Sequence, residues 1–192
     1  MRLPLLDIRR WRLDPAGFAE ELRIACHKVG FFQLQHGLPS GLTRQAVQEA
    51  HAFFNQPTEE KQAMDYARSP AFRGYMATGV ENTAGAADLR EQVEIAAEEG
   101  SCSARAWPAH RRLRGPNQWP ASQPTLQTVI GEYAEHMARV SEEITEALCM
   151  ALNLERRAMS HLFEYAFDCL HLQCLSLPST LPSTRFHHTL SY

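Results

Sequence analysis

The sequence predicts an α+β fold that is mainly helical and contains a few short strands. Near the C-terminal side, apolar residues recur at steps of three or four over about thirty positions, which is the period of one helix face. Near the N-terminus, short apolar runs alternate with shorter helical patterns and are separated by Gly and Pro. Hydrophobic residues make up 44% and charged residues 21% of the 192 residues, a composition typical of one globular domain, or of one domain and a fragment.

The longest helix is predicted to begin at Pro124, after a segment that cannot be helical. That segment is GPNQWP (115–120), in which two prolines and a glycine fall within six residues. The predicted inward positions are Leu126, Ile130, Tyr133, Met137, Val140, Ile144, Leu148 and Leu152. The opposite face carries Glu132, Glu135, Arg139, Glu142, Glu143 and Glu146. At 1.5 Å per residue such a helix is about 40 Å long, so it needs a large apolar surface to cover it.

Earlier in the chain, two strands and two helices alternate. The predicted strands are 3–8 and 31–35. Between them Asp14 can cap a helix whose first residue is Pro15 and which ends at Gly30. The apolar face of that helix consists of Phe18, Leu22, Ala25 and Val29. A second helix is predicted over 40–55, with an inward face of Leu42, Ala46 or Val47, Ala50, Phe53 and Phe54.

The middle and the end of the chain are less regular. A short helix is predicted over 58–66, an extended segment at 91–94 and a last helix over 155–167. Residues 173–192 are rich in Ser, Thr and Pro and show no helical or alternating pattern, so we interpret them as a divergent, disordered tail.

Charge and cysteine content exclude several partners and compartments. The net charge of -3 and pI near 6.3 give no reason to expect a nucleic-acid partner. No apolar run approaches the roughly 18 residues of a membrane span, so no membrane partner is expected. The five cysteines are odd in number and form no CxxC pair, which favours reduced thiols and a cytoplasmic location.

No catalytic or metal-binding residue is predicted from local motifs. A mononuclear iron site needs two imidazoles and a carboxylate, commonly with His-x-Asp or His-x-Glu on a strand. None of the nine histidines has Asp or Glu two residues further on. Nucleophile-elbow, Walker and dinucleotide motifs are also missing from the sequence. The charged runs Glu59-Glu60-Lys61 and Glu98-Glu99 are interpreted as solvated faces rather than acid/base groups.

Six segments in a fixed order carry a resemblance to a known family. They are LPLLDI (3–8), FAEELRIACHKVGFFQLQHGLP (18–39), HAFFNQPTEEKQ (51–62), RGYMATGVE (73–81), AADLREQVEIAAE (86–98) and GPNQWP immediately before the long helix. Together they resemble the N-terminal region of the iron(II)- and 2-oxoglutarate-dependent dioxygenases of the isopenicillin N synthase-like superfamily. The resemblance covers about residues 3–172 and breaks off before the catalytic barrel.

The resemblance implies an N-terminal domain over 1–172 and little or none of the double-stranded β-helix barrel that carries the iron triad. Complete family members use Fe(II) and 2-oxoglutarate and act on small molecules, but none of those ligand positions can be transferred, so no cofactor is expected for this chain. The loop at Arg73 and Tyr75 would contact substrate in a complete enzyme. Alternatively, Arg73 is solvated and Tyr75 packs on the barrel wall. Asp88, Glu91 and Glu94 match the family's acidic stretch, for which we expect a structural role.

Two functions follow from these expectations. In the first, the chain is the scaffold portion of an oxygenase and is inactive alone; truncation, altered splicing or a frameshift would each give the observed tail. In the second, it is a binding or regulatory module that docks the exposed face of its long helix on a partner or a full-length relative. Because a few strands cannot close a barrel, we expect low stability and self-association through exposed apolar helix faces.

Overall fold

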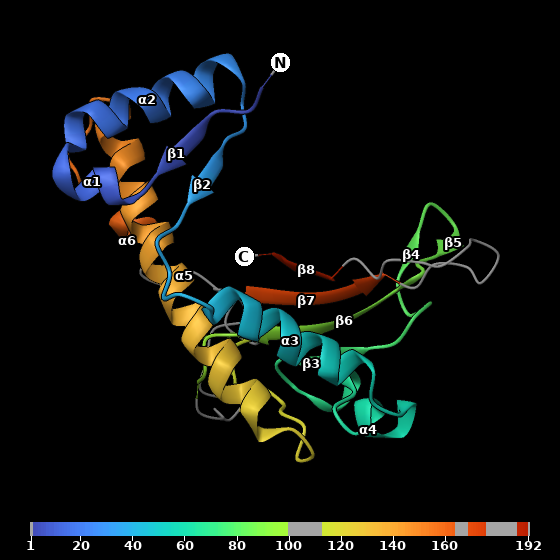
Figure 1. Ribbon diagram of the computed structural model, residues 1–192. Coiled ribbons are helices and arrows are strands. Elements are labelled where there is room, and N and C mark those ends of the chain that lie inside the picture. Colours follow the sequence, from blue (N-terminus) through green and yellow to red (C-terminus); the bar gives the residue numbers. More distant parts are fainter. Residues whose placement is uncertain (1, 100–112, 164–168, 176–187, 192) are drawn as a thin grey trace. The chain divides into compact units, whose positions relative to one another are not determined.

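The computed structural model describes residues 2–99, 113–163, 169–175 and 188–191 (Figure 1). The chain divides into two compact units. The first consists of residues 1–42 and 133–166, and the second of residues 43–132 and 167–192. The longest helix, α5 (Pro124–Ala151), supplies residues to both. The fold is mainly helical with short strands, as predicted.

The first unit begins with two parallel strands that flank two helices. The elements in order are β1 (Leu5–Asp7), α1 (Arg9–Leu13), α2 (Pro15–Lys28) and β2 (Gln33–Gln35). The predicted cap of α2 is confirmed, because the Gly17 N–H donates to the Asp14 carboxylate at 3.0 Å. Gly30 closes the helix with a φ of 82°, a conformation that glycine adopts without strain. Helix α1 was not predicted.

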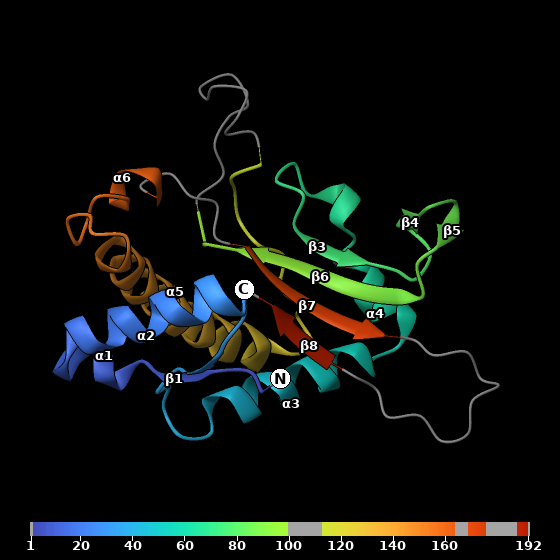
Figure 2. The same ribbon diagram turned by 90° about the horizontal axis from the view of Figure 1, so that it is seen from above.

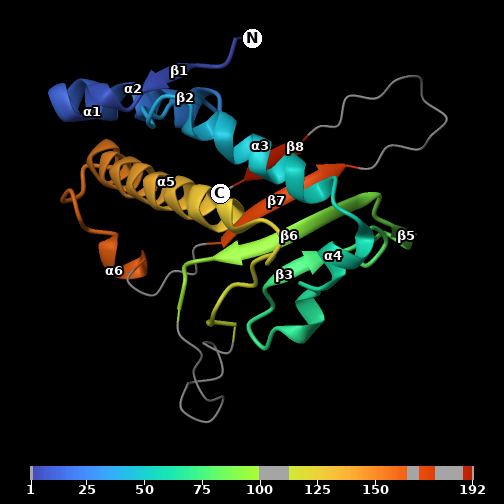
Figure 3. The ribbon, with the colours of Figure 1, turned by 60° about the horizontal axis from the view of Figure 1, so that its bottom comes forward.

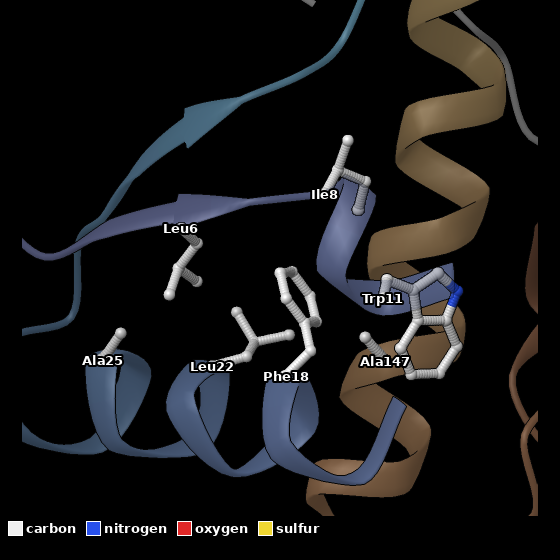
Figure 4. Close-up of a cluster of buried hydrophobic side chains, with 7 residues drawn as sticks. All are labelled: Leu6, Ile8, Trp11, Phe18, Leu22, Ala25 and Ala147. Atoms are coloured by element: carbon white, nitrogen blue, oxygen red, sulfur yellow. The ribbon is translucent and has the colours of Figure 1, made fainter. Parts of the chain in front are cut away.

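The core of the first unit lies between α2, β1 and the C-terminal half of α5 (Figure 4). The Trp11 and Phe18 rings meet at a centroid distance of 6.1 Å. Burial of each large apolar side chain contributes about 1.5–3 kcal/mol relative to exposure. The cluster consists of Leu6, Ile8, Trp11, Phe18, Leu22, Ala25 and Ala147, which confirms the predicted inward face of α2 for three of its four positions.

The second unit contains helices α3 (Leu42–Phe54) and α4 (Thr58–Gln62), a 3-10 turn η1 (Tyr66–Arg68) and an antiparallel sheet (Figure 2). The sheet has the order β3-β6-β7-β8. Its strands are β3 (Gly74–Met76), β6 (Arg90–Ala96), β7 (Cys169–Leu175) and β8 (His188–Ser191). A separate hairpin joins β4 (Asn82–Thr83) to β5 (Ala86–Ala87). Within the described residues, no sheet closes into a barrel.

Helix α5 confirms the longest predicted element. Leu126, Ile130, Tyr133 and Val140 are buried as expected, whereas Leu152 lies beyond the helix end and is 61% exposed. The exposed residues of α5 are polar except for Pro124. The helix therefore gives no support to the predicted apolar docking face. In the part of the chain that the structure describes, no helix is both long and apolar enough to cross a bilayer.

Two predictions near the C-terminus are corrected. In the described residues the predicted helix 155–167 is present only as α6 (Ser160–Phe163). The preceding residues form turns, in which Arg156 and Arg157 both pair with Glu146 on α5. The expectation of a tail without regular structure over 173–192 is wrong for residues 173–175, which lie in β7, and for residues 188–191, which form β8. The first pairs with β6, with Gln92 opposite Gln173, and the second pairs with β7. Residues 176–187 of the predicted tail lie outside the described residues.

Replacing Leu22 with Ala removes a side chain that is 0% exposed in the first core. We expect a loss of about 2–5 kcal/mol in the free energy of unfolding, because the vacated volume is not refilled. Urea denaturation followed by far-UV circular dichroism measures this loss. The matched control is Leu13→Ala, at a site 85% exposed, where we expect a change within about 0.5 kcal/mol. Equal effects at the two positions would contradict the assigned core.

Candidate functional site: a buried charged cluster and the loops it holds

A lysine, a tyrosine and a glutamate meet in the interior of the second unit. Lys61 Nζ lies 2.7 Å from Glu91 Oε2, and the Tyr75 hydroxyl donates to the same oxygen at 2.6 Å. All three residues are buried, with exposures of 7%, 8% and 4% for Lys61, Glu91 and Tyr75. Lys61 also donates to the main-chain carbonyl of Phe54 at 3.0 Å.

The sheet register and one helix bring these side chains together. Tyr75 on β3 is opposite Val93 on β6, and Glu91 lies two residues before Val93, so both polar groups share one face of the sheet. Helix α3 packs on that face (Figure 3), where the Phe53 and Tyr75 rings are 6.2 Å apart. The Lys61 ammonium, carried by α4, lies 5.4 Å from the centre of the Tyr75 ring, within the range of a cation–π contact.

This arrangement fixes α3 and α4 to the sheet. The positive charge of Lys61 is balanced by Glu91, and one carboxylate oxygen accepts two hydrogen bonds. Two buried charges with good hydrogen bonds can offset each other's desolvation, whereas either alone is costly. The prediction that Glu59-Glu60-Lys61 forms a solvated face is therefore wrong for Lys61. The expected structural role of the acidic stretch agrees with the contacts of Glu91.

Arg73 and Tyr75, the predicted substrate-binding residues, both lie inside the second unit. Arg73 is 2% exposed, and its guanidinium donates to the carbonyls of Ala71 at 2.8 Å and Leu113 at 2.9 Å. The alternative of a solvated Arg73 is therefore wrong. Tyr75 contacts Glu91 and Phe53, as described above. These contacts give both residues a structural role in holding the loop, and contact with a substrate stays a prediction.

The GPNQWP segment (115–120) is anchored by the side-chain amides of Asn117 and Gln118. Gln118 Nε2 lies within hydrogen-bonding distance of the carbonyls of Met64, Asp65 and Arg73, at 3.2, 2.9 and 2.7 Å. Asn117 pairs with Ala96 in both directions, accepting from its N–H at 2.9 Å and donating to its carbonyl at 2.8 Å. One amide therefore ties the segment to β6, and the other ties it to the loop before β3.

Gly74 is required by the close approach of this anchor. Its φ is 117°, and a Cβ there would lie 2.1 Å from the Met64 carbonyl oxygen and 2.5 Å from Gln118 Nε2. No side chain can occupy that space without moving the backbone. This explains why a glycine lies between Arg73 and Tyr75.

The other face of β6 carries a second polar group. Gln92 is 4% exposed and its amide lies 3.3 Å from Met76 Sδ and 3.1 Å from Glu94 Oε1. Arg90 pairs with Glu81, and this hydrogen bond raises the pKa of the guanidinium. The Asp88 carboxylate lies 3.5 Å from the same arginine. The acidic stretch thus has charged or amide partners on both sheet faces.

Iron is the metal that the resemblance implies, and a mononuclear iron site needs two imidazoles and a carboxylate. Among the described residues, no three His, Cys, Asp or Glu side chains are arranged to hold a metal ion. The carboxylate of Glu91 is already bound to Lys61 and Tyr75. The described residues therefore do not fit an iron site.

The family model and the curated relatives that match this chain point to the same family of proteins. The family model described as non-haem dioxygenase in morphine synthesis N-terminal matches residues 3–122. The 2-oxoglutarate-dependent dioxygenase frbJ of Dothideomycetidae sp. is 32% identical over 166 residues, which are 84% of this chain and 44% of that protein. A homoarginine-6-hydroxylase of Arabidopsis thaliana is 29% identical over 162 residues, which are 78% of this chain and 45% of that protein.

Solved structures give the same result for the fold. The crystal structure of a 2OG-Fe(II) oxygenase family protein from Caulobacter crescentus has a TM-score of 0.76 and 25% identity, covering 90% of this chain and 55% of that one. The structure of JOX2 in complex with 2OG, Fe and JA has a TM-score of 0.68 and 28% identity, covering 91% and 48%. The chain thus spans about half the length of the relatives that it matches.

Replacing Lys61 with Met leaves the Glu91 carboxylate buried without its counter-ion. We expect a destabilisation of about 3–5 kcal/mol, because the remaining charge loses its compensation. The double variant Lys61→Met/Glu91→Gln removes both charges, and we expect it to be more stable than Lys61→Met. Urea titrations of the three proteins measure the differences. A single variant as stable as the original chain would show that the pair is not buried in solution.

Replacing Gly74 with Ala adds a methyl group where the Met64 carbonyl lies. We expect a large loss of stability or failure to fold. Gly85 is the control, because its φ is 86° and nothing lies within 4 Å of an added Cβ. Gly85→Ala should show only the left-handed backbone cost of roughly 1–2 kcal/mol. The thermal midpoints of the two variants separate the steric clash from backbone strain, and equal midpoints would contradict the close approach.

Proposed function

The chain belongs to the family of non-haem dioxygenase N-terminal regions, and we propose that it forms the supporting portion of an iron(II)- and 2-oxoglutarate-dependent oxygenase. We also propose that this portion is inactive alone. The family match over residues 3–122 carries this proposal. The relatives that it resembles are about twice as long, so the activity of the whole protein is assigned to the complete oxygenase rather than to these residues.

The buried contacts support a scaffold role. Lys61, Tyr75 and Glu91 bind one another, and Arg73 binds main-chain carbonyls. Gln118 binds carbonyl groups of Met64 and Asp65, before η1, and of Arg73, between η1 and β3. These polar groups hold helices, strands and loops in position. In an active site, by contrast, the acid and base groups must reach a reacting molecule.

For the complete oxygenase we propose Fe(II) and 2-oxoglutarate as cofactors, a small-molecule substrate and a cytoplasmic location. This chain by itself is proposed to need no cofactor. Within that enzyme, Arg73 and Tyr75 are proposed to line the approach of the substrate. The carbonyl contacts of Arg73 would then set the shape of that approach.

Self-association through exposed apolar helix faces is retained as a proposal. Large exposed apolar side chains on described helices are few, namely Leu13, Ile24 and Leu162. The alternative of a regulatory module that docks through α5 has no such support, because the exposed side chains of that helix are polar except for Pro124. The scaffold role is therefore the function that the contacts favour.

The proposal is tested by supplying the purified chain with Fe(II), 2-oxoglutarate and oxygen and measuring succinate. We expect no succinate above the protein-free background, because the described residues offer no three-ligand metal site. The dioxygenase of Dothideomycetidae sp. is the positive control. Stoichiometric iron binding with turnover would refute the assignment of an inactive scaffold.

A chimera tests the supporting role itself. Residues 1–172 would replace the matched segment of the Dothideomycetidae dioxygenase, which is 32% identical to this chain. We expect the chimera to fold and to decarboxylate 2-oxoglutarate. The same chimera with Gly74→Ala should lose this activity together with its folded signal, whereas Gly85→Ala should retain both. A folded chimera without any decarboxylation would count against the proposed role.

A further inference from the structure

Helix α5 has a glycine in its interior that packing does not require. Gly131 is half-buried. Apart from its chain neighbours and the backbone of its own helix, nothing lies within 4 Å of a Cβ added there, so an alanine would fit without a clash. Glycine in the middle of a helix is less stable than alanine, because it loses more backbone freedom on folding. Gly131 therefore weakens α5 at a point where no neighbouring atom requires a glycine.

The segment after Gly131 is also held less firmly than the two ends of the helix. Before it, Leu126 and Ile130 are 0% exposed. Further on, Glu143 pairs with Arg12 at 2.8 Å, and Ala147 belongs to the buried cluster of the first unit. Between these parts, residues 134–139 contain no buried residue. Helix segments with few buried side chains open at a lower free energy than segments fixed by a core.

The same part of α5 is where the chain passes from one compact unit to the other. The crossing lies between Glu132 and Tyr133. An earlier crossing, between residues 42 and 43, follows Gly41, whose φ is 89° and whose added Cβ would have nothing within 4 Å. Gly41 lies in a turn in which the Leu42 N–H donates to the Pro39 carbonyl at 3.1 Å. The third crossing lies outside the described residues. Both described crossings thus follow a glycine that neighbouring side chains do not confine.

We propose that residues 131–139 of α5, together with the turn 39–42, form a hinge through which the two units change their relative orientation. Hinges consist of a few residues that absorb the change in backbone angles while the flanking parts stay rigid. Opening at Gly131 breaks only the helix hydrogen bonds that span it or accept at it, which are those of the N–H groups 132–135. The buried ends of α5 stay fixed in their own units.

Hydrogen–deuterium exchange along α5 tests the opening. We expect the protection factors of N–H groups 132–135 to be at least about tenfold lower than those of 146–149, which lie in the buried end of the helix. Gly131→Ala should raise the protection of 132–135 roughly two- to fivefold, because alanine stabilises the closed helix. The control Glu142→Ala changes an exposed residue of the same helix outside the hinge, and it should leave the protection of 132–135 unchanged.

Distances between spin labels follow the motion of the units. Lys28 on α2 and Gln62 on α4 are exposed and lie in different units. Labels are attached there through an unnatural amino acid, because the chain contains five cysteines. Double electron–electron resonance should give a broad distance distribution, which narrows in Gly131→Ala and keeps its width in Glu142→Ala.

Two results would overturn the hinge. One is equal protection along the whole of α5, and the other is a distance distribution that Gly131→Ala leaves unchanged. Circular dichroism of each variant checks that the fold is retained. Neither measurement uses iron or 2-oxoglutarate, so the outcome is independent of the proposed function.

Discussion

The second unit depends on the side-chain amide of Gln118. Its single nitrogen lies within 3.2 Å of three carbonyl oxygens, which come from two segments before and after η1. Buried main-chain carbonyls need partners. The Gln118 amide is a partner for the carbonyls of Asp65 and Arg73, and it adds to the bond that the Met64 carbonyl accepts from the Tyr75 N–H at 2.7 Å. The adjacent Asn117 does the same for Ala96 at the end of β6. A glycine is then required at position 74, because the side chain of any other residue would displace the Gln118 amide.

The buried pair of Lys61 and Glu91 complements this anchor from the other side of β3. A hydrophobic residue at each position would pack without the cost of desolvating charges. The charged pair instead requires a specific geometry. Lys61 donates to the Phe54 carbonyl at the end of α3, and Glu91 accepts a hydrogen bond from the Tyr75 hydroxyl. The pair thus joins the end of α3, the short helix α4 and the two strands β3 and β6 at a single point. Its energy depends on correct placement of all four elements.

The sequence predicted the helices better than the sheet, for a physical reason. Helix faces depend on residues three and four apart, so the periods of α2, α3 and α5 are visible locally. Strand β7 is defined by its pairing with β6, more than seventy positions earlier, and Ser and Pro in the following segment masked it. Lys61 was misjudged because two exposed glutamates precede it, and its partner Glu91 lies 30 residues away. No pattern of neighbouring residues in the sequence indicates a partner that is 30 positions away.

The contact of Arg73 and Tyr75 with a substrate stays a prediction. The structure gives both side chains polar contacts inside the second unit, and Tyr75 belongs to the buried cluster itself. The buried polar side chains of the second unit bind one another or main-chain carbonyls, so their contacts hold loops and helices in place. These contacts have to be made within the unit, because a buried charge or amide without a partner costs free energy.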